Sequence, residues 1–328
     1  MNRPIKTIAV LTSGGDSPGM NAAIRAVVRG AAFNGMKCFG IYRGYQGLIE
    51  NDFEELGPRS VRNLINRGGT FLKSARSKQF REKDFRQKAF NNLQENAIDA
   101  LVVIGGDGSF TGADVFSKEF DIPVIGIPGT IDNDINGTDY TLGYDTALNT
   151  VVEAIDKIRD TASSHDRLFL VEVMGRDAGD IALNSGIGAG AEEILIPEED
   201  LGVEKLVEAL HKSSKTGKTS SIVVVAEGDQ IGKNIAKLAL RLEKELPEYE
   251  TKVTVLGHIQ RGGSPSCSDR VLASRLGVGA IDALIDGKSN IMVGIENKKI
   301  VHVPFEIAIN TKKTLDFDLM RVADIVST

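Results

Sequence analysis

The sequence predicts an α/β protein of two domains with largely parallel sheets, on three observations. A chain of 328 residues is long enough for about two domains, each with its own core. Apolar runs of four to eight residues alternate with amphipathic helical stretches along nearly the whole chain, which is typical of βα units. Glycine is enriched, at 35 residues, and much of it directly follows the apolar runs. These glycine-rich loops are the first indication of a binding function.

The first βα unit shows the pattern. Residues 8–11 have the apolar character of a strand and residues 20–33 the periodicity of a helix, with Ser17 offering an N-cap and Pro18 the favoured first helical position. The same order recurs further along. We expect strands at residues 101–104, 124–127, 168–173, 222–226 and 253–256, and helices from residue 109 and at residues 146–161, 201–212, 234–244 and 269–285.

Composition excludes several classes of protein. With 39 Lys and Arg against 45 Asp and Glu, the net charge of −6 gives no field for wrapping nucleic acid, so we expect no nucleic-acid partner. No apolar stretch approaches the roughly 18 residues that span a bilayer, and residues 1–12 do not resemble a signal peptide. We therefore expect a cytoplasmic protein with no membrane partner. Cys38 and Cys267 are too few for a disulfide framework or a zinc site.

Two nucleotide-binding patterns are matched only in part. The Gly-Lys-Thr at residues 217–219 resembles the end of a P-loop, but Lys212 stands where the first glycine is required, and the segment runs from helix to strand. Residues 186–191 match a loose dinucleotide fingerprint, yet a helix precedes them and a strand follows. We reject the first pattern and interpret the second as a structural loop.

Three glycine-rich loops, at residues 12–16, 105–109 and 128–134, each follow a predicted strand. Ligands bind at the carboxyl edge of open α/β sheets, where backbone N–H groups without side chains can close around phosphate oxygens. Any one of these loops could be only a tight turn. Three at the same topological position predict a pocket for a polyphosphate.

Carboxylates in these loops suggest phosphoryl transfer. Asp107 stands where one carboxylate could hold Mg²⁺ against phosphates. Asp132 and Asp134 are two residues apart, so in an extended segment they face the same way, one as base toward a hydroxyl and the other supporting the metal. The alternative is that Asp132, Asn133 and Asp134 are only turn formers.

Six ordered blocks then resemble those of the bacterial ATP-dependent 6-phosphofructokinase family. The resemblance runs from residue 8 to about residue 295. The blocks are LTSGGDSPGMNAAIR (11–25), NRGGTFLKSAR (66–76), GGDGS (105–109), PGTIDNDI (128–135), VEVMGR (171–176) and LGHIQRGGSP (256–265).

The resemblance implies a fold and an activity. The fold is two Rossmann-like α/β sandwich domains with largely parallel sheets, interleaved along the chain. Residues 1–143 plus 260–309 would bind ATP, and residues 144–259 plus 310–328 would bind fructose 6-phosphate. Mg·ATP would phosphorylate the sugar 1-hydroxyl, giving fructose 1,6-bisphosphate and ADP, in a homotetramer whose active sites borrow residues from a neighbouring subunit.

Roles for individual residues follow from the resemblance. Asp132 would be the base, Asp107 the Mg²⁺ ligand, and Arg76 a bridge between the phosphates of both substrates. For each arginine the alternative is a solvated surface charge. The implied catalytic residues are Arg76, Thr130, Asp132 and Arg176; the implied ATP-binding residues are Gly15, Arg76, Arg81, Gly106, Asp107, Gly108 and Ser109; and the implied substrate-binding residues are Thr130, Asp132, Asp134, Arg167, Met174, Arg176, Glu227, Lys252, His258 and Arg261.

The sequence departs from the family in two places. Lys252 stands where the family usually has an arginine for the sugar phosphate, which keeps the charge but loses the planar fork. At the effector site, Pro58 and Thr216 stand where the family has cations, so we expect weak control by ADP or phosphoenolpyruvate. The matching effector positions are Arg25 and Arg29, four apart on one helix face, with Arg159, Gly190, Glu192 and Lys218.

Particular residues distinguish this function from three alternatives. A pyrophosphate-dependent relative typically has Asp and Lys where this chain has Gly108 and Gly129, and that bulkier pair would fill the space of the ATP α-phosphate. NAD kinases and diacylglycerol kinases share GGDG but not the blocks at 128–135 and 256–265. A non-catalytic nucleotide sensor of the same fold would be expected to have lost Asp132 or Arg76, and both are present.

Overall fold

The computed structural model describes residues 4–162, 167–199, 201–215 and 220–326. The chain divides into two compact units. Unit 1 comprises Met1–Ile131, Ile135–Thr146 and Arg261–Lys313, and unit 2 comprises Asp132–Asp134, Ala147–Gln260 and Thr314–Thr328. Each unit contains its own largely parallel sheet, so the predicted α/β class is confirmed.

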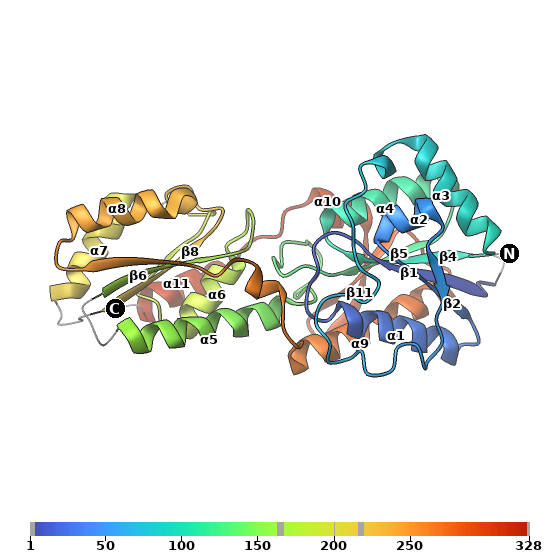
Figure 1. Cartoon of the computed structure of the whole chain (residues 1–328), viewed down its shortest axis with the longest axis horizontal. Coiled ribbons are helices and arrows are strands. Elements are labelled where there is room, and N and C mark those ends of the chain that lie inside the picture. Colours follow the sequence, from blue (N-terminus) through green and yellow to red (C-terminus); the bar gives the residue numbers. More distant parts are fainter. Residues whose placement is uncertain (1–3, 163–166, 200, 216–219, 327–328) are drawn as a thin grey trace. The chain divides into compact units, whose positions relative to one another are not determined.

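Unit 1 is built on a seven-stranded sheet in the order β11-β10-β5-β4-β1-β2-β3. The four central pairings are parallel, and the two outermost strands run antiparallel to their neighbours. Figure 1 shows helices on both faces of this sheet. The elements are β1 (Thr7–Thr12), α1 (Met20–Phe33), β2 (Lys37–Ile41), α2 (Gly44–Glu50), β3 (Phe53–Glu55), η1 (Gln79–Arg81), α3 (Lys83–Glu95), β4 (Ala100–Gly105), α4 (Asp107–Phe120), β5 (Val124–Pro128), α9 (Cys267–Ile285), β10 (Ile291–Glu296), β11 (Lys299–Pro304) and α10 (Phe305–Asn310).

The central strand β1 explains why both faces are covered. Ile8 and Val10 point into one core with α1 and α9, whereas Ala9 and Leu11 point into a second core with α2, α4 and α10. Alternate residues of a strand face opposite sides, so a continuous apolar run needs a layer of helices on each side. Polar groups are thereby confined to the ends of the strands.

Unit 2 has a four-stranded, fully parallel sheet in the order β7-β8-β6-β9. Leu168, Leu170, Val223 and Val225 pack against α7 and α8 on one face. On the other face α6 contacts β8 and is itself covered by α11 (Figure 1). The elements are α5 (Tyr144–Ala162), which begins in unit 1, β6 (Arg167–Val173), α6 (Asp180–Ala189), β7 (Glu193–Leu195), α7 (Val203–Lys215), β8 (Ser221–Ala226), η2 (Gly232–Asn234), α8 (Ile235–Glu245), β9 (Glu250–Val255), η3 (Gly257–Arg261) and α11 (Phe317–Val326).

The start of α1 differs from the prediction. The helix covers Met20–Phe33 as expected, but its N-cap is Gly19, at φ 104°, and no side chain caps it. Ser17 instead contributes its carbonyl oxygen, which accepts a hydrogen bond from Met20 N at 3.3 Å. Gly19 turns the chain in a left-handed conformation that other residues rarely adopt, so Ser17 and Pro18 lie before the helix. The assignments of Ser17 as N-cap and Pro18 as first helical residue are therefore wrong.

No helix within the described ranges combines the length and the apolarity needed to cross a bilayer.

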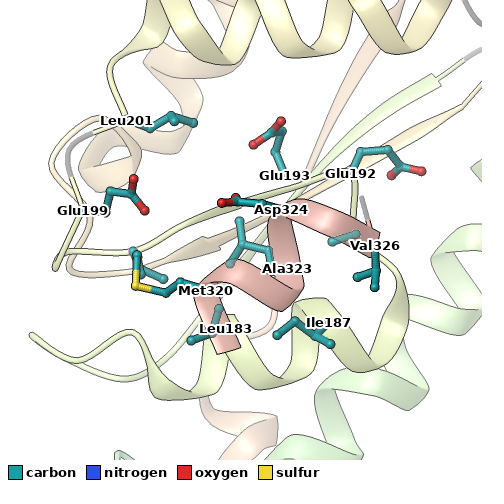
Figure 2. A pocket seen from close by; sticks show the side chains of 13 residues that line it. Leu183, Ile187, Glu192, Glu193, Glu199, Leu201, Met320, Ala323, Asp324 and Val326 are labelled. Carbon is teal, nitrogen blue, oxygen red and sulfur yellow. The ribbon is translucent and has the colours of Figure 1, made fainter. Parts of the chain in front are cut away.

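Unit 2 contains a small cavity of about 60 Å³ under the C-terminal helix. Apolar side chains of α6 and α11, such as Leu183 and Met320, form part of its wall, and Figure 2 shows the carboxylates of Glu193 on β7 and Asp324 on α11 beside them. Burial raises the pKa of Glu193 to about 7, and the neighbouring carboxylates of Asp324, Glu199 and Glu192 add to the shift.

This raised pKa predicts how stability depends on pH. Between the ordinary value of 4.5 and about 7, folded Glu193 binds more protons than the unfolded chain does, so stability falls as pH rises through that window and levels off above it. Glu193→Gln removes the charge, and we expect its thermal midpoint at pH 8 to exceed that of the parent by about 2–4 °C, with the gain shrinking toward pH 5. Exposed Glu243 provides the control, Glu243→Gln. A constant difference between Glu193→Gln and the parent across this pH range would contradict the assignment.

Candidate active site

The three glycine-rich loops of unit 1 meet at one edge of its sheet. They follow β1, β4 and β5, which are adjacent and parallel. Backbone bonds join them directly: Ser13 N donates to the Ile104 carbonyl at 3.0 Å, and Gly129 N donates to the Gly105 carbonyl at 2.9 Å. The strand order of the sheet also reverses direction at this point, because β2 and β4 lie on opposite sides of β1. Such switch points are where open α/β sheets bind ligands.

Close backbone approach explains Gly105, and a second glycine, Gly15, lies against an arginine side chain. A Cβ at Gly105 would lie 2.4 Å from Ser109 Oγ and 2.6 Å from the Ser13 carbonyl oxygen. A Cβ at Gly15 would lie 2.6 Å from Nη1 of Arg261, and the same nitrogen donates to the Asp16 carbonyl at 3.1 Å. The Arg261 guanidinium therefore lies directly against the Gly15 loop, where it can attract an anion.

The N-terminus of α4 opens at this edge. Its N-cap is Gly106, which has no side chain to cap the helix. The next two residues, Asp107 and Gly108, are exposed, and Ser109 is buried. A Cβ at Gly108 would meet no atom within 4 Å. The N-terminus of a helix carries partial positive charge and unpaired N–H groups, which favour phosphate. Thr130 lies beside it, since a Cβ at Gly106 would be 3.8 Å from Thr130 Cβ.

The segment that carries Arg76 is fixed to the same edge. Asn21 of α1 donates to the carbonyls of Arg67 and Gly68 at 3.1 and 3.0 Å, and Thr12 Oγ1, at the end of β1, donates to the Lys73 carbonyl at 2.9 Å. Arg76 follows three residues later and is exposed. Arg81, at the end of η1, is exposed as well.

In unit 2, the predicted base lies beside a predicted catalytic arginine. Asp132 is 3% exposed, and its Oδ2 lies 3.9 Å from Nε of Arg176. Next to it, Asn133 has a φ of 54° and donates through Nδ2 to Oδ1 of Asp180 at 3.3 Å. Asp180 is the first residue of α6. The segment Asp132–Asp134, in which Asp134 is half-buried, is therefore held by two side chains of unit 2.

Glu227 fixes the backbone beneath Arg176. Its Oε1 accepts hydrogen bonds from Gly175 N at 3.2 Å and from Arg176 N at 2.8 Å. Arg176 has a φ of 53°, a left-handed conformation that costs a non-glycine residue energy. A Cβ at Gly228 would lie 2.0 Å from the Arg176 carbonyl oxygen, so the loops that follow β6 and β8 are in direct contact.

Two predicted phosphate-binding cations share one carboxylate. Arg167 Nε lies 2.8 Å from Glu250 Oε2, and Lys252 Nζ lies 2.5 Å from Glu250 Oε1. These hydrogen bonds, that of Lys252 first, lower the pKa of Glu250 to about 2. Lys252 belongs to β9, an edge strand, and His258 is exposed in the following turn η3.

The predicted effector residues fall on both units. On α1 of unit 1, burial and the charge of Arg29 lower the pKa of Arg25. In unit 2, Arg159 donates through Nη2 to the carbonyls of Ala189 and Gly190, both at 2.7 Å, and its Nη1 lies 3.7 Å from Glu192. Lys218 lies outside the described residues.

Sequence reasoning missed two side chains that support the site. Asp180 contacts Asn133 across 47 positions of sequence, and Gln260 contacts Met174 across 86. Gln260 lies in the block at residues 256–265, between His258 and Arg261. Its uncharged amide in a glycine-rich turn is the one feature of the sequence that could have indicated a supporting role. Asp180 follows a glycine at a helix start, which also suits an ordinary first-turn acid.

The fold and the site define a class: an α/β protein in which glycine-rich loops, a helix N-terminus and an arginine, all groups suited to phosphate, meet at one sheet edge. Comparison with known proteins makes this specific. The family model described as Phosphofructokinase matches residues 7–284. The chain belongs to the phosphofructokinase family.

Similar proteins cover the whole chain. It is 55% identical over 318 residues to a Bacteroides thetaiotaomicron protein named ATP-dependent 6-phosphofructokinase 2, covering 97% of each chain. A Brevibacillus brevis protein named ATP-dependent 6-phosphofructokinase is 53% identical, covering 98% of this chain and 100% of its own. Among solved structures, phosphofructokinase from Saccharomyces cerevisiae matches with a TM-score of 0.88 and 38% identity, over 98% of this chain and 46% of the yeast chain. A pyrophosphate-dependent phosphofructokinase from Marinobacter aquaeolei, at 24% identity and a TM-score of 0.83 over 96% of this chain and 86% of its own, shares the fold.

Proposed function

We infer that the chain is an ATP-dependent 6-phosphofructokinase, a glycolytic kinase. It transfers the γ-phosphoryl group of ATP to the 1-hydroxyl of fructose 6-phosphate and gives fructose 1,6-bisphosphate and ADP. The observation that carries this function is the meeting of the loops after β1, β4 and β5 at one sheet edge, with Arg261 against Gly15. Relatives of that name at 53–55% identity over nearly the whole chain support it. ATP and sugar phosphates are cytoplasmic metabolites, so we place the enzyme in the cytoplasm.

The open N-terminus of α4 favours ATP over pyrophosphate as donor. Apart from its own helix turn, a side chain at position 108 would meet no atom of the described residues within 4 Å of its Cβ. With glycine there, this space is left to the α-phosphate of a nucleotide. The family resemblance implies an aspartate at this position in relatives that use pyrophosphate.

We propose that unit 1 binds the nucleotide and unit 2 the sugar phosphate. Gly15, Gly106, Gly108 and Ser109 would present backbone to the phosphates of ATP, with Arg76 and Arg81 neutralising charge from exposed positions. In unit 2, Met174, Arg176, Glu227 and His258 come from the carboxyl ends of β6, β8 and β9, which is the ligand-binding edge of that sheet.

Magnesium would be held by Asp107. This carboxylate is exposed in the first turn of α4, beside the backbone proposed for phosphate, and Mg²⁺ needs only one or two carboxylates when phosphate oxygens and water complete its shell. No cluster of three His, Cys, Asp or Glu suited to a metal occurs in the described part of the chain, which fits a metal carried in with the nucleotide. When bound, Mg²⁺ neutralises charge on the transferring phosphate.

Asp132 is the proposed base. Its carboxylate would accept the proton of the sugar hydroxyl as the oxygen attacks phosphorus, and Nε of Arg176 lies 3.9 Å from it. Thr130 would support the transferring phosphoryl group, and Asp134 would contribute to the metal's surroundings.

Arg167 and Lys252 are proposed to serve the sugar phosphate of a neighbouring subunit in a homotetramer. Both cations sit at the amino ends of β6 and β9, paired with Glu250. The edge strand β9 also exposes Val253 and Val255, at 39% and 56%, which suits a surface that another chain covers.

A coupled assay tests the reaction and its donor together. We expect turnover of fructose 6-phosphate with Mg·ATP, and with pyrophosphate a rate no higher than with no donor. Omission of the sugar phosphate measures the background hydrolysis of ATP. Activity with pyrophosphate in place of ATP would overturn the donor assignment, and no activity with either would overturn the function.

Asp132→Asn tests the base. The amide cannot take a proton, so we expect kcat to fall by about 10²–10⁴-fold while KM for ATP stays within about twofold. Asp156→Asn, the same change at an exposed position of α5, is the control and should leave kcat unchanged. Turnover of Asp132→Asn within a fewfold of the parent would show that another group takes the proton.

We propose that effector control in this chain is weak. Arg159 is engaged by the carbonyls of Ala189 and Gly190 and by Glu192, which leaves its guanidinium fewer donors for a phosphate. Two further cations of the family site are replaced by Pro58 and Thr216. Each charge-assisted bond lost removes on the order of 1.5–3 kcal/mol of contact with the effector, and an effector can shift an equilibrium only by its differential affinity.

Rate curves against fructose 6-phosphate, with and without each effector, measure this control. We expect ADP and phosphoenolpyruvate at millimolar concentration to move half-saturation by less than about twofold. A matched relative that keeps both cations should respond strongly under the same conditions. A large shift by either ligand in this chain would contradict the proposal.

A further inference from the structure

Gln260 is buried, and its side-chain amide makes two hydrogen bonds. Both bonds go to backbone groups in or next to residues that are proposed to hold the sugar phosphate. The Gln260 side chain is 0% exposed. Its Oε1 accepts from Met174 N at 3.2 Å, and its Nε2 donates to the Gly257 carbonyl at 2.9 Å. Both partners are backbone groups, so the amide joins two segments of chain independently of their side chains.

These two segments leave adjacent strands. Met174 follows β6 and Gly257 follows β9, which pair in parallel through Glu172 and Val255. One further backbone bond, from Leu256 N to the Glu172 carbonyl at 3.0 Å, closes the ladder. The strand order reverses at this point, with β8 on one side of β6 and β9 on the other. Beyond the ladder, the Gln260 side chain links the segment after β6 to the turn after β9.

Each segment carries proposed substrate contacts. The first leads from Met174 to Arg176, whose backbone Glu227 fixes and whose guanidinium lies 3.9 Å from Asp132. The second contains His258, one residue after Gly257 and two before Gln260. The distance between the two segments decides whether both can touch one sugar phosphate at once.

We propose that Gln260 is a positioning residue for fructose 6-phosphate: its amide fixes the segment of Met174 and Arg176 against the turn of His258. This inference rests on the proposed function. An amide of this length supplies both the acceptor for the Met174 N–H and the donor for the Gly257 carbonyl, whereas an ionised glutamate supplies acceptors alone. Misplacement of binding groups by even 1 Å has large kinetic effects, because they must act on one ligand together.

A merely structural role makes a different prediction. Loss of the two hydrogen bonds would lower stability and the fraction of folded enzyme, which reduces the apparent maximal rate. The KM values do not depend on enzyme concentration, so a structural role alone would leave both of them unchanged. A positioning role raises KM for the sugar phosphate and spares KM for ATP.

The experiment compares Gln260→Met and Gln260→Glu with the parent in the full chain. Methionine keeps the volume and removes both polar groups, whereas glutamate keeps the acceptor and places a second oxygen against the Gly257 carbonyl. Exposed Gln230, also in unit 2, supplies the matched control Gln230→Met. KM for fructose 6-phosphate is measured at saturating ATP, and KM for ATP at saturating sugar phosphate.

We expect both Gln260 variants to raise KM for fructose 6-phosphate by at least about fivefold, with KM for ATP within about twofold and Gln230→Met unchanged. Unchanged KM values in either Gln260 variant, or equal rises in both KM values, would overturn the proposal. Activity of the parent separates the two inferences: an inactive parent refutes the proposed function, whereas an active parent with a normal sugar-phosphate KM in the Gln260 variants refutes this one alone.

Discussion

The burial of β1, β4 and β5 on both faces is the constraint on which the proposed nucleotide site of unit 1 depends. Ile8, Val10 and Leu11 are all 0% exposed, and helices cover the sheet on each side. No charged group can be placed along such strands without a large desolvation cost. The atoms available to a phosphate are therefore those at the carboxyl ends, where the chain leaves the sheet.

At those ends, the closeness of neighbouring backbones explains the glycines. Gly105 cannot accommodate a Cβ because Ser109 and the Ser13 carbonyl oxygen already occupy that space. The same closeness brings the loops after β1, β4 and β5 and the N-terminus of α4 to one edge of the sheet. The strand order thus brings together the main-chain groups of the proposed phosphate site, and the arginines would add positive charge to it.

The proposed sugar-phosphate site of unit 2 is arranged differently, because side chains there fix the backbone. Asn133 and Arg176 both have positive φ, at 54° and 53°, although glycine would adopt that conformation at less cost. Asp180 holds the first and Glu227 holds the second. The strain is offset by these bonds and leaves the Asp132 carboxylate and the Arg176 guanidinium 3.9 Å apart.

Local patterns predicted β1, α1 and most of the later βα units, but not β2, α2 or α3, and contacts distant in sequence were missed as well. Periodicity alone places α1 at Met20–Phe33 and β8 within one residue, because each is specified by its own apolar positions. The hairpin of β10 and β11 was not predicted, since its turn places Asn297 and Lys298 at positive φ without the usual glycine. Gln260 was missed for another reason: an amide's partners 86 residues away are decided by strand order, which no local pattern records.

The segment Asp132–Asp134 shows how the chain divides these tasks. Its neighbours Ile131 and Ile135 belong to unit 1, yet its own contacts place it in unit 2, with Arg176 and Asp180. Thr130, two residues before the proposed base, belongs to unit 1, as do the glycine-rich loops after β1 and β4. The proposed base is therefore fixed relative to the groups proposed to hold the acceptor sugar. A base must lie within hydrogen-bond reach of the hydroxyl it deprotonates, and Asp132 shares its unit with Arg176 and Met174, two of the residues proposed to hold the sugar.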